Sequence, residues 1–446
     1  MKNSIYNISP IDGRYSQLTE ELKQYFSEAA LIKYRVYIEI EYFIHLCSIN
    51  LPELKGISKK NLKDISKIAS EMSQKDILEI KKIEKITNHD VKAVEYFIKK
   101  KFKQLNLLKY QEFIHFGLTS QDINNTASPL LLMDALNLCL YPELDQLIKK
   151  LYQLSIKWKN ISMLARTHGQ PASPTKLGKE IKVFKVRLEE QLNQLKKIPH
   201  SGKFGGATGN MNAHYASYPK INWHKFAKDF LKNIKLKRSY PTTQIEHYDN
   251  LAAQLDTIKR INTILIDFSR DIWMYISMSY FNQKTKKNEV GSSAMPHKIN
   301  PIDFENAEGN LGLANSILTH LSEKLPISRL QRDLSDSTVM RNIGVPFAHS
   351  IISYKAIIKG LEKLTVNDNK IHADLNNDWG ILAEAIQTIL RREGVKKPYE
   401  LLKKVTRNNK TINEVAITQF INDLKVSNRV KTELKKLTPF NYTGQS

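Results

Sequence analysis

The stretch that decides the fold is LAAQLDTIKRINTILIDFSRDI, residues 251–272. Its apolar residues recur at spacings of three and four: Leu251, Leu255, Ile258, Ile261, Leu265, Phe268 and Ile272. This spacing is typical of the buried face of an amphipathic α-helix. No proline lies between Pro241 and Pro296, so the pattern predicts a single helix of about 30 residues.

Two other segments repeat this pattern and extend the prediction to a helix bundle. The first contains Leu144, Leu147, Ile148, Leu151 and Leu154, and the second contains Ile181, Phe184, Leu188, Leu192 and Leu195. Helices of this length expose more apolar surface than one neighbour covers, so we expect oligomerisation through a shared bundle. Strands do not alternate with helices along the chain, which argues against a parallel sheet. The predicted fold class is therefore all-α.

Length and composition indicate several domains. The chain has 446 residues, which is more than one compact core accommodates. Gly (17) and Pro (15) are sparse, and this favours long helices over turn-rich β structure. We expect a small N-terminal helical domain at residues 1–116, the long-helix domain at 117–360 and a C-terminal helical domain at 361–446.

Charge and cysteine content bear on partners and location. The chain has 68 Lys and Arg against 45 Asp and Glu, a net charge of +23. The lysines are spread along the whole chain, which favours a general compositional bias over a nucleic-acid partner. Only Cys47 and Cys139 are present, so no disulfide framework is expected. With no signal peptide and no apolar run of about 18–20 residues, the chain is expected to be cytoplasmic, with no membrane partner.

The sequence GSSAMPHKIN, residues 291–300, has the composition of a catalytic loop. Gly and Pro predict a mobile loop, and it contains two serines and Lys298. These are the groups needed to remove a proton beside a carboxylate and to stabilise the resulting anion. An exposed surface loop without function is the alternative, and composition alone leaves it open.

A helix is expected directly after this loop. Asn300 is predicted to be its N-cap, with Pro301 at the first helical position and Asp303 at the third. The helix N-terminus would then face the loop and favour bound anions. Glu305 and Asn306 follow on the first turns. One of them is a candidate to orient a histidine and the other to contact a ligand, although a solvated helix face is the alternative for each.

Four other polar clusters interrupt the helical pattern. They are TNHD (87–90), HFGLTSQD (115–122), RTHGQPASP (166–174) and RLQRDLSDSTVMRN (329–342). His168 lies among residues that break regular structure, and a histidine presented on a turn is suited to general acid catalysis. Arg332 and Arg341 with nearby hydroxyl groups suit a phosphate. A structural histidine and surface ion pairs are the respective alternatives.

The common metal and nucleotide motifs are missing from the sequence. It has no HExxH or Cys/His ligand spacing and no GxxxxGK[ST] phosphate loop. GKFGGATGN, residues 202–210, fits no GxGxxG register and does not follow a predicted strand. We therefore expect this segment to be a loop between two helices that borders the site.

Taken together, these segments resemble the fumarase/aspartase superfamily and, within it, the bacterial-type adenylosuccinate lyase family. The loop at residues 291–300, called the serine loop below, and THGQP (167–171) are similar to the superfamily as a whole. SPIDGRY (9–15), TNHDVKAVEYF (87–97), YPTTQIE (240–246) and DLSDSTVMRN (333–342) are similar to the adenylosuccinate lyase family in particular. The resemblance extends from Ser9 to about Tyr442, nearly the whole chain.

The resemblance implies both an assembly and a reaction. It implies an all-α fold of three domains and a homotetramer whose central helices form a shared bundle. Each active site would be built from three subunits, with no metal or organic cofactor. The reaction would be β-elimination of fumarate from adenylosuccinate, giving AMP. The same site would cleave the succinyl-aminoimidazole-carboxamide ribotide of purine synthesis. The partner would be a small nucleotide substrate, not a nucleic acid.

The resemblance also implies roles for individual residues. Ser292 would be the general base, His168 the general acid and Glu305 the carboxylate that orients His168. Lys298 and Asn300 would bind the succinyl carboxylates. The implied substrate contacts are Arg14, Tyr15, Asn88, His89, Asp90, Thr119, Ser120, Gln244, Lys298, Ile299, Asn300, Asn306, Arg332, Ser337, Thr338, Val339, Met340 and Arg341.

One departure and several alternatives remain. Family members often read Gln-Ile-Glu-Pro-His-Asp where this chain has Gln244 to Asp249 with His247 and Tyr248 inside, so a role for the family's histidine is in doubt. Another lyase of the superfamily, such as argininosuccinate lyase or fumarase, would share the serine loop but lack DSTVMR. A basic helical RNA-binding protein and a structural protein that kept the fold without the activity are alternatives from other classes.

Overall fold

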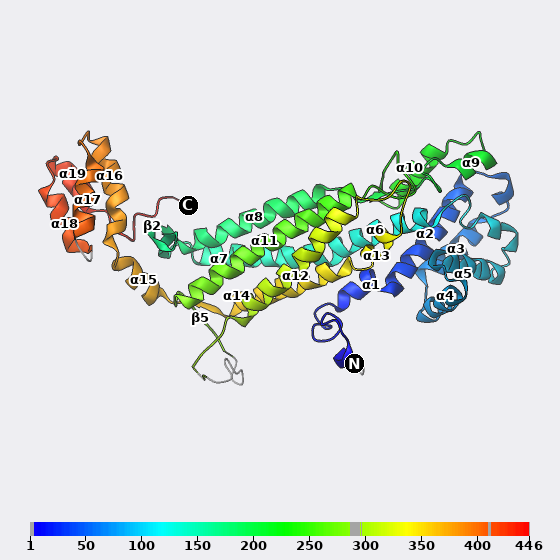
Figure 1. The fold of residues 1–446 in the computed structure, drawn as a ribbon, viewed down its shortest axis with the longest axis horizontal. Helices are drawn as coiled ribbons and strands as arrows, with labels where there is room; N and C mark the ends of the chain where they lie inside the picture. The colour runs from blue at the N-terminus through cyan, green and yellow to red at the C-terminus, as the bar shows by residue number, and fades with distance from the viewer. Residues whose placement is uncertain (1–3, 286–294, 296, 409–411, 446) are drawn as a thin grey trace. The chain divides into compact units, whose positions relative to one another are not determined.

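The computed structural model describes residues 4–285, 295, 297–408 and 412–445, and across them the chain is helical apart from three two-stranded sheets (Figure 1). The predicted all-α class is confirmed. Two compact units are distinguished: residues 1–144, 191–263 and 309–355 form unit 1, and residues 145–190, 264–308 and 356–446 form unit 2. The predicted division into three domains remains a prediction.

Five long helices pass through both units. They are α7 (Tyr141–Lys157), α8 (Leu177–Lys197), α11 (Asp249–Ser277), α12 (Ile302–Lys324) and α14 (Gly344–Lys363). The stretch at 251–272 lies in α11, which has 29 residues as its periodicity predicts. Six of its seven apolar residues are buried, and Leu251 is half-buried. Within unit 1, Asn262 at the middle of α11 bonds both Ser350 and Tyr354 of α14, at 2.9 and 2.7 Å.

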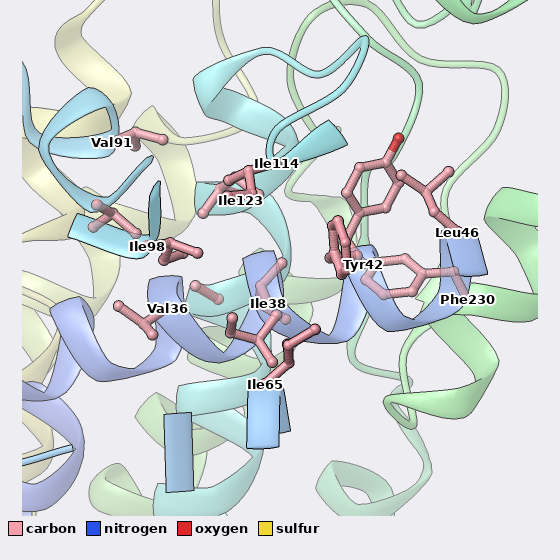
Figure 2. Packing of buried hydrophobic residues seen from close by; sticks show 14 of the residues in the cluster. Val36, Ile38, Tyr42, Leu46, Ile65, Val91, Ile98, Ile114, Ile123 and Phe230 are labelled. Carbon is pink, nitrogen blue, oxygen red and sulfur yellow. The ribbon is translucent and has the colours of Figure 1, made fainter. Parts of the chain in front are cut away.

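Further helices, which lie within one unit, complete unit 1. They are α1 (Lys23–Phe26), α2 (Glu28–Ser48), α3 (Lys59–Ser70), α4 (Gln74–Thr87), α5 (Asp90–Gln104), α6 (Ser120–Ala135), α9 (Asn212–Ser217), α10 (Trp223–Asn233) and α13 (Ser335–Met340), with strands β3 (Ser201–Gly202) and β4 (Lys237–Arg238). Figure 2 shows the core around α2, where Val36 and Tyr42 pack against Ile65, Ile123 and Phe230. The paired strands β3 and β4 are parallel, a small exception to the predicted absence of parallel pairing.

Unit 2 contains two antiparallel strand pairs and the C-terminal helices. The strands are β1 (Ser162–Thr167), β2 (Gln170–Lys176), β5 (Phe281–Gln283) and β6 (Leu364–Val366), and the helices are α15 (Asp368–Asn376), α16 (Ala383–Arg392), α17 (Pro398–Asn408), α18 (Glu414–Asp423) and α19 (Asn428–Lys435). A separate apolar core around Trp379, Leu382, Ile386 and Ile417 packs α16, α17, α18 and α19 together.

The β1–β2 hairpin places His168 at its tip. Thr167 pairs with Gln170, which leaves His168 and Gly169 as a two-residue turn. Their φ angles are +53° and +74°, and positive φ at both central positions is the requirement of a type I′ hairpin turn. At its base the hairpin is fixed to the C-terminal segment, because Ser162 donates a 2.8 Å hydrogen bond to the Phe440 carbonyl. The predicted turn around His168 is thus part of a hairpin.

The start of α12 differs from the prediction by one residue. The helix begins at Ile302, and the carbonyl of Pro301 accepts from Phe304 and Glu305 at 3.0 and 3.2 Å. Pro301, not Asn300, therefore occupies the cap position. Asp303 does not close a capping box either, because its buried carboxylate pairs with Lys359 and Lys363 at 3.0 and 2.8 Å. These tertiary ion pairs outweigh the local capping preference.

A buried ion pair joins the first turn of α6 to the glycine-rich loop, residues 202–210, in unit 1. The Asp122 and Lys203 side chains are both 0% exposed, and Lys203 Nζ lies 2.8 Å from Asp122 Oδ1. The same carboxylate accepts from the backbone N–H groups of Thr119, Gly205 and Gly206 at 2.8–3.1 Å. Lys203 also donates to the Gly206 carbonyl at 2.5 Å. The pair therefore links the N-terminus of α6 to the glycine-rich loop.

A second buried polar contact supports the loop that precedes α6. The Tyr42 hydroxyl donates to the Phe116 carbonyl at 2.6 Å and lies 3.0 Å from His214 Nε2. A phenol has one proton, so Nε2 of His214 must carry the hydrogen of the second bond. Nδ1 has no hydrogen-bond partner in the described part of the chain. Burial of this ring lowers the pKa of His214 to about 4.

In the part of the chain that the structure describes, no helix combines the length and the apolar character that a membrane span needs.

The pKa of His214 predicts a specific pH dependence of stability. The unfolded chain protonates this residue below about pH 6.5, whereas the folded chain does so only near pH 4. The free energy of unfolding should therefore fall as the pH drops from 6.5 towards 4. Relative to His214→Gln, the wild type should lose about 1 kcal/mol between pH 6.5 and 5.5, measured by urea unfolding. His320→Gln, at an exposed position, is the control. Parallel pH profiles for wild type and His214→Gln would contradict the assignment.

Removing Lys203 should strongly destabilise the chain. Lys203→Met leaves the Asp122 carboxylate buried without its counter-charge, and breaking a buried pair in this way costs about 3–5 kcal/mol. Lys370→Met is the matched control, because Lys370 forms an exposed pair with Asp374 on one helix at 2.7 Å. Loss of such a pair costs about 0.5 kcal/mol or less. Urea unfolding of both variants tests this, and equal losses would refute a special role for the buried pair.

Candidate active site

The predicted site residues divide between the two units. Unit 1 contains a pocket of about 280 Å³ that is lined by α1, α2, α4, α5, α6 and α13 and by Tyr248, which directly precedes α11. Four predicted substrate contacts line it: Asp90, Ser337, Met340 and Arg341. Unit 2 contains His168, Lys298, Ile299, Asn300, Glu305 and Asn306, and Ser292 lies outside the described residues.

A buried charge pair forms one wall of the pocket. Arg35 of α2, 7% exposed, donates to Asp90 at 2.6 Å and to the Asn124 side chain at 2.8 Å. Arg341 Nη2 lies 4.0 Å from the same Asp90 oxygen. Burial alone raises the pKa of Asp90, but the Arg35 charge and the Val91 N–H outweigh it and hold this pKa below its usual value. Asp90 is therefore an ionised acceptor between two guanidinium groups.

Helix ends bring the next candidates close to this wall. Asn88 ends α4 in the left-handed conformation, with φ +50°, and His89 begins α5 by accepting from the Lys92 N–H at 3.0 Å. Thr119 and Ser120 begin α6. His89 Nε2 lies 3.5 Å from Ser120 Oγ, so two predicted clusters that are distant in sequence meet at adjacent helix N-termini. Such termini favour anions.

The predicted phosphate cluster is ordered by a network around Arg332. Arg332 donates to Ser337 Oγ at 2.9 Å and lies 3.6 Å from Asp336 Oδ1. With its oxygen turned towards the guanidinium, as the surrounding donors require, the Gln121 amide accepts from Arg332 at 2.6 Å. Arg332 precedes α13 and Ser337 lies inside it. Thr338 is exposed and Val339 half-buried on the same helix, and neither lines the pocket.

The remaining unit 1 candidates lie on loops. Gln244 donates to the Ala207 carbonyl at 3.1 Å, which joins its segment to the glycine-rich loop. That loop approaches closely at Gly209, whose φ is +82°, and an added Cβ would lie 2.0 Å from the Thr242 carbonyl. Arg14 and Tyr15 belong to the N-terminal segment. Arg14 lines a separate open hollow that shares no residue with the main pocket.

The unit 2 candidates are more exposed. His168 is exposed at the hairpin tip and has no polar partner among the described residues. Glu305 accepts from Trp273 Nε1 at 3.3 Å, and the Ile299 carbonyl accepts from Gln283 at 3.1 Å. Lys298 is exposed and Asn300 half-buried. Within the described residues of one chain, Glu305 and His168 form no hydrogen bond, so the predicted orienting contact remains a prediction.

Sequence reasoning missed several residues that line the pocket. These residues are Arg35, Gln121, Asn124, Asn125 and Tyr248. One signal was available for Arg35, because it is a charged residue within the apolar repeat of α2, between Ile32 and Val36, which are both buried. The other four depend on contacts between distant segments.

Within the described ranges, no group of three or more His, Cys, Asp or Glu side chains is arranged to bind a metal ion.

Known proteins match this chain over nearly its full length. The family described as Lyase matches residues 13–314, and the family described as Adenylosuccinate lyase C-terminal matches residues 328–443. The adenylosuccinate lyase of Dictyostelium discoideum is 58% identical, over 99% of this chain and 97% of that protein. The adenylosuccinate lyase of Escherichia coli K12 is 45% identical, over 100% and 98%.

Solved structures share the fold at low sequence identity. A fumarate lyase from Mesorhizobium sp. BNC1 has a TM-score of 0.75 at 17% identity, covering 95% of each chain. The 3-carboxy-cis,cis-muconate lactonizing enzyme of Pseudomonas putida has a TM-score of 0.73 at 21% identity, covering 96% of this chain and 94% of that one. Given these structural matches, and above all its whole-length identity of 45–58% to the relatives, the chain is an enzyme of the lyase class and belongs to the adenylosuccinate lyase family.

Proposed function

We propose that this chain cleaves adenylosuccinate to AMP and fumarate, and that it cleaves the succinyl-aminoimidazole-carboxamide ribotide in the same way. The observation that carries the proposal is the 45–58% identity to adenylosuccinate lyases over the whole length of the chain. The pocket of unit 1 supports it, because Arg332 and Ser337 next to it form a set of donors suited to a phosphate monoester.

The proposed reaction needs one base and one acid. Ser292 removes the proton from the carbon next to one succinyl carboxylate, and the electron pair left behind forms the fumarate double bond as the C–N bond breaks. His168 gives a proton to the departing nitrogen. Negative charge builds on the carboxylate during proton removal, and Lys298 with Asn300 stabilises it. Each well-placed donor of this kind lowers the barrier by about 3 kcal/mol.

A homotetramer with shared sites would complete this machinery. The support comes from apolar side chains on the long helices that remain 40–56% exposed in one chain: Tyr152, Ile156, Val183, Val186, Trp273, Met274 and Leu313. A stripe of this kind on long helices is suited to a shared bundle. We further propose that His168 and Ser292 of one active site come from different protomers, with Glu305 orienting His168 there.

The remaining site residues are proposed in the roles that the family resemblance implies. The nucleotide would be contacted by Asn88, His89, Asp90, Thr119, Ser120 and residues 337–341. Three further residues would close around it: Arg14, Tyr15 and Gln244. Ile299 and Asn306 would contact the succinyl group. The three-domain division and a cytoplasmic location are proposed on the same basis.

Fumarate release from separate substrates tests the function. Wild-type protein should release fumarate from adenylosuccinate, but neither from argininosuccinate nor from malate. Ser292→Ala and His168→Ala should each lower kcat by at least about 100-fold, the minimum expected when a general base or acid is removed. Ser293→Ala is the matched control and should retain most activity. Near-normal turnover in both site variants would refute their roles, and cleavage of argininosuccinate instead would favour the rival lyase.

Mixed assemblies test the shared site. Ser292→Ala and His168→Ala tetramers, each nearly inactive, are dissociated, mixed and reassembled. If the two residues of one site come from different protomers, about a quarter of the sites regain both intact residues, because each contributing chain has an even chance of being intact. Activity should recover to a similar fraction of wild type. A mixture that stays as inactive as its components would show that one protomer supplies both residues.

A further inference from the structure

Tyr248 occupies a strained position that its contacts must maintain. It lies directly before α11, is 5% exposed and has a φ of +63°. The left-handed region is unfavourable for a bulky side chain, and such conformations persist only where the surroundings enforce them. The Tyr248 N–H donates to the Glu246 carboxylate, and the Tyr248 carbonyl accepts from Ala252 at 2.8 Å. The backbone is thus held on both sides of the residue.

The phenol of Tyr248 connects two walls of the pocket. It accepts from Asn125 Nδ2 on α6 at 2.7 Å and donates to Asp336 Oδ2 on α13 at 3.2 Å. The oxygen of the same Asn125 amide accepts from the Glu246 N–H at 2.9 Å. Burial raises the pKa of Tyr248, so its hydroxyl stays protonated and acts as a donor to Asp336 at neutral pH.

Asp336 in turn orients the two groups proposed to bind phosphate. Its Oδ1 atom accepts from the Ser337 N–H at 2.6 Å and lies 3.6 Å from the Arg332 guanidinium. Asp336 is 3% exposed, so its carboxylate has few alternatives to these partners. The hydrogen bond from Tyr248 fixes Oδ2, which leaves Oδ1 directed at Ser337 and Arg332. The hydrogen bonds therefore connect Tyr248, directly before α11, through Asp336 to both residues proposed to bind phosphate.

We propose that Tyr248 is a positioning residue that sets the affinity of the site for the phosphate group of the nucleotide, acting through Asp336 on Arg332 and Ser337. The proposal rests on the proposed function for the nature of the ligand. It differs from a general packing role, because it predicts a loss confined to ligands that carry a phosphate. The hydroxyl matters, not the ring, so Tyr248→Phe is the informative change.

The chain offers a matched control in Tyr354. This tyrosine is also buried in unit 1, and its hydroxyl also bonds an asparagine, Asn262, at 2.7 Å. Tyr354→Phe therefore removes a comparable buried hydrogen bond, but from the helix bundle and not from the pocket. Any loss of ligand affinity or activity that both variants share is therefore attributed to lower folding stability.

The experiment compares the wild type, Tyr248→Phe and Tyr354→Phe in steady-state kinetics and in calorimetric binding of AMP and adenosine. We expect Tyr248→Phe to raise KM for adenylosuccinate and Kd for AMP by about 10-fold, the effect of one lost hydrogen bond to a charged group. We expect kcat to stay within about 2-fold of wild type, because the chemical step does not involve the phosphate. The Kd for adenosine should be unchanged, because adenosine carries no phosphate. Tyr354→Phe should change none of these values.

A double variant tests the route through Asp336. In an Asp336→Asn background, Tyr248→Phe should have no further effect on AMP binding, because coupled residues are not additive. Equal AMP affinity in wild type and Tyr248→Phe, an equal loss for adenosine, or an equal effect of Tyr354→Phe would each overturn the proposal. If Tyr248→Phe does not fold, Asp336→Asn, which weakens the contacts to Arg332 and Ser337 directly, replaces it with the same expectations for AMP and adenosine. AMP binding is read without turnover, so a wild type that binds AMP but releases no fumarate would refute the proposed function and leave this test standing.

Discussion

The buried pair of Asp122 and Lys203 is the contact on which the pocket of unit 1 depends. A carboxylate with no exposure to solvent needs every acceptor position satisfied, and Asp122 receives donors from its own helix start, from Lys203 and from two glycine N–H groups. This requirement leaves one arrangement of the Thr119 segment against the glycine-rich loop. The pair adds little net stability as such, because desolvation offsets attraction, but it makes alternative arrangements costly.

Other segments around the pocket are also positioned by hydrogen bonds between polar groups. Gln244 attaches to the glycine-rich loop, and Tyr248, four residues later in the sequence, attaches the start of α11 to Asn125 of α6. Arg35 holds Asp90 at the start of α5. Asp90 and Tyr248, which both face the pocket, are thus each oriented by a second polar group. Preorganised donors of this kind do not have to reorganise when a charged ligand binds.

Sequence reasoning succeeded where the determinant is local and periodic. The apolar repeat at 251–272 predicted a helix of about 30 residues, and α11 has 29, because burial of one helix face depends only on spacing. The predicted N-cap of α12, Asn300, was wrong by one residue. The preference of Asn for the cap competes there with the ion pairs that Asp303 makes to α14, much later in the chain. The hairpin around His168 was expected only as a turn, since Pro and Gly in 166–174 conceal its strands.

The residues that sequence reasoning missed share one property. Lys203 lies in the segment that was expected to be a loop bordering the site, without a role for the lysine itself, and Tyr248 was noted only as a departure from the family pattern. The function of each depends on a partner in a distant segment, Asp122 for one and Asp336 for the other. No spacing rule connects such pairs, so one sequence does not reveal them. The predicted contacts Asp90, Ser337 and Arg341 were found because their motifs are contiguous.

The placement of His168 has a consequence for the proposed chemistry. A type I′ turn holds both of its residues in a narrow range of backbone angles, and the base of the hairpin is bonded to the C-terminal segment, so the imidazole is presented from a rigid support. Its own chain leaves it exposed, yet proton transfer to a leaving nitrogen is most effective where water is excluded. In the proposed tetramer the neighbouring protomers supply that exclusion. Assembly would then be part of catalysis, because an isolated chain would hold the acid in the correct geometry but in bulk solvent.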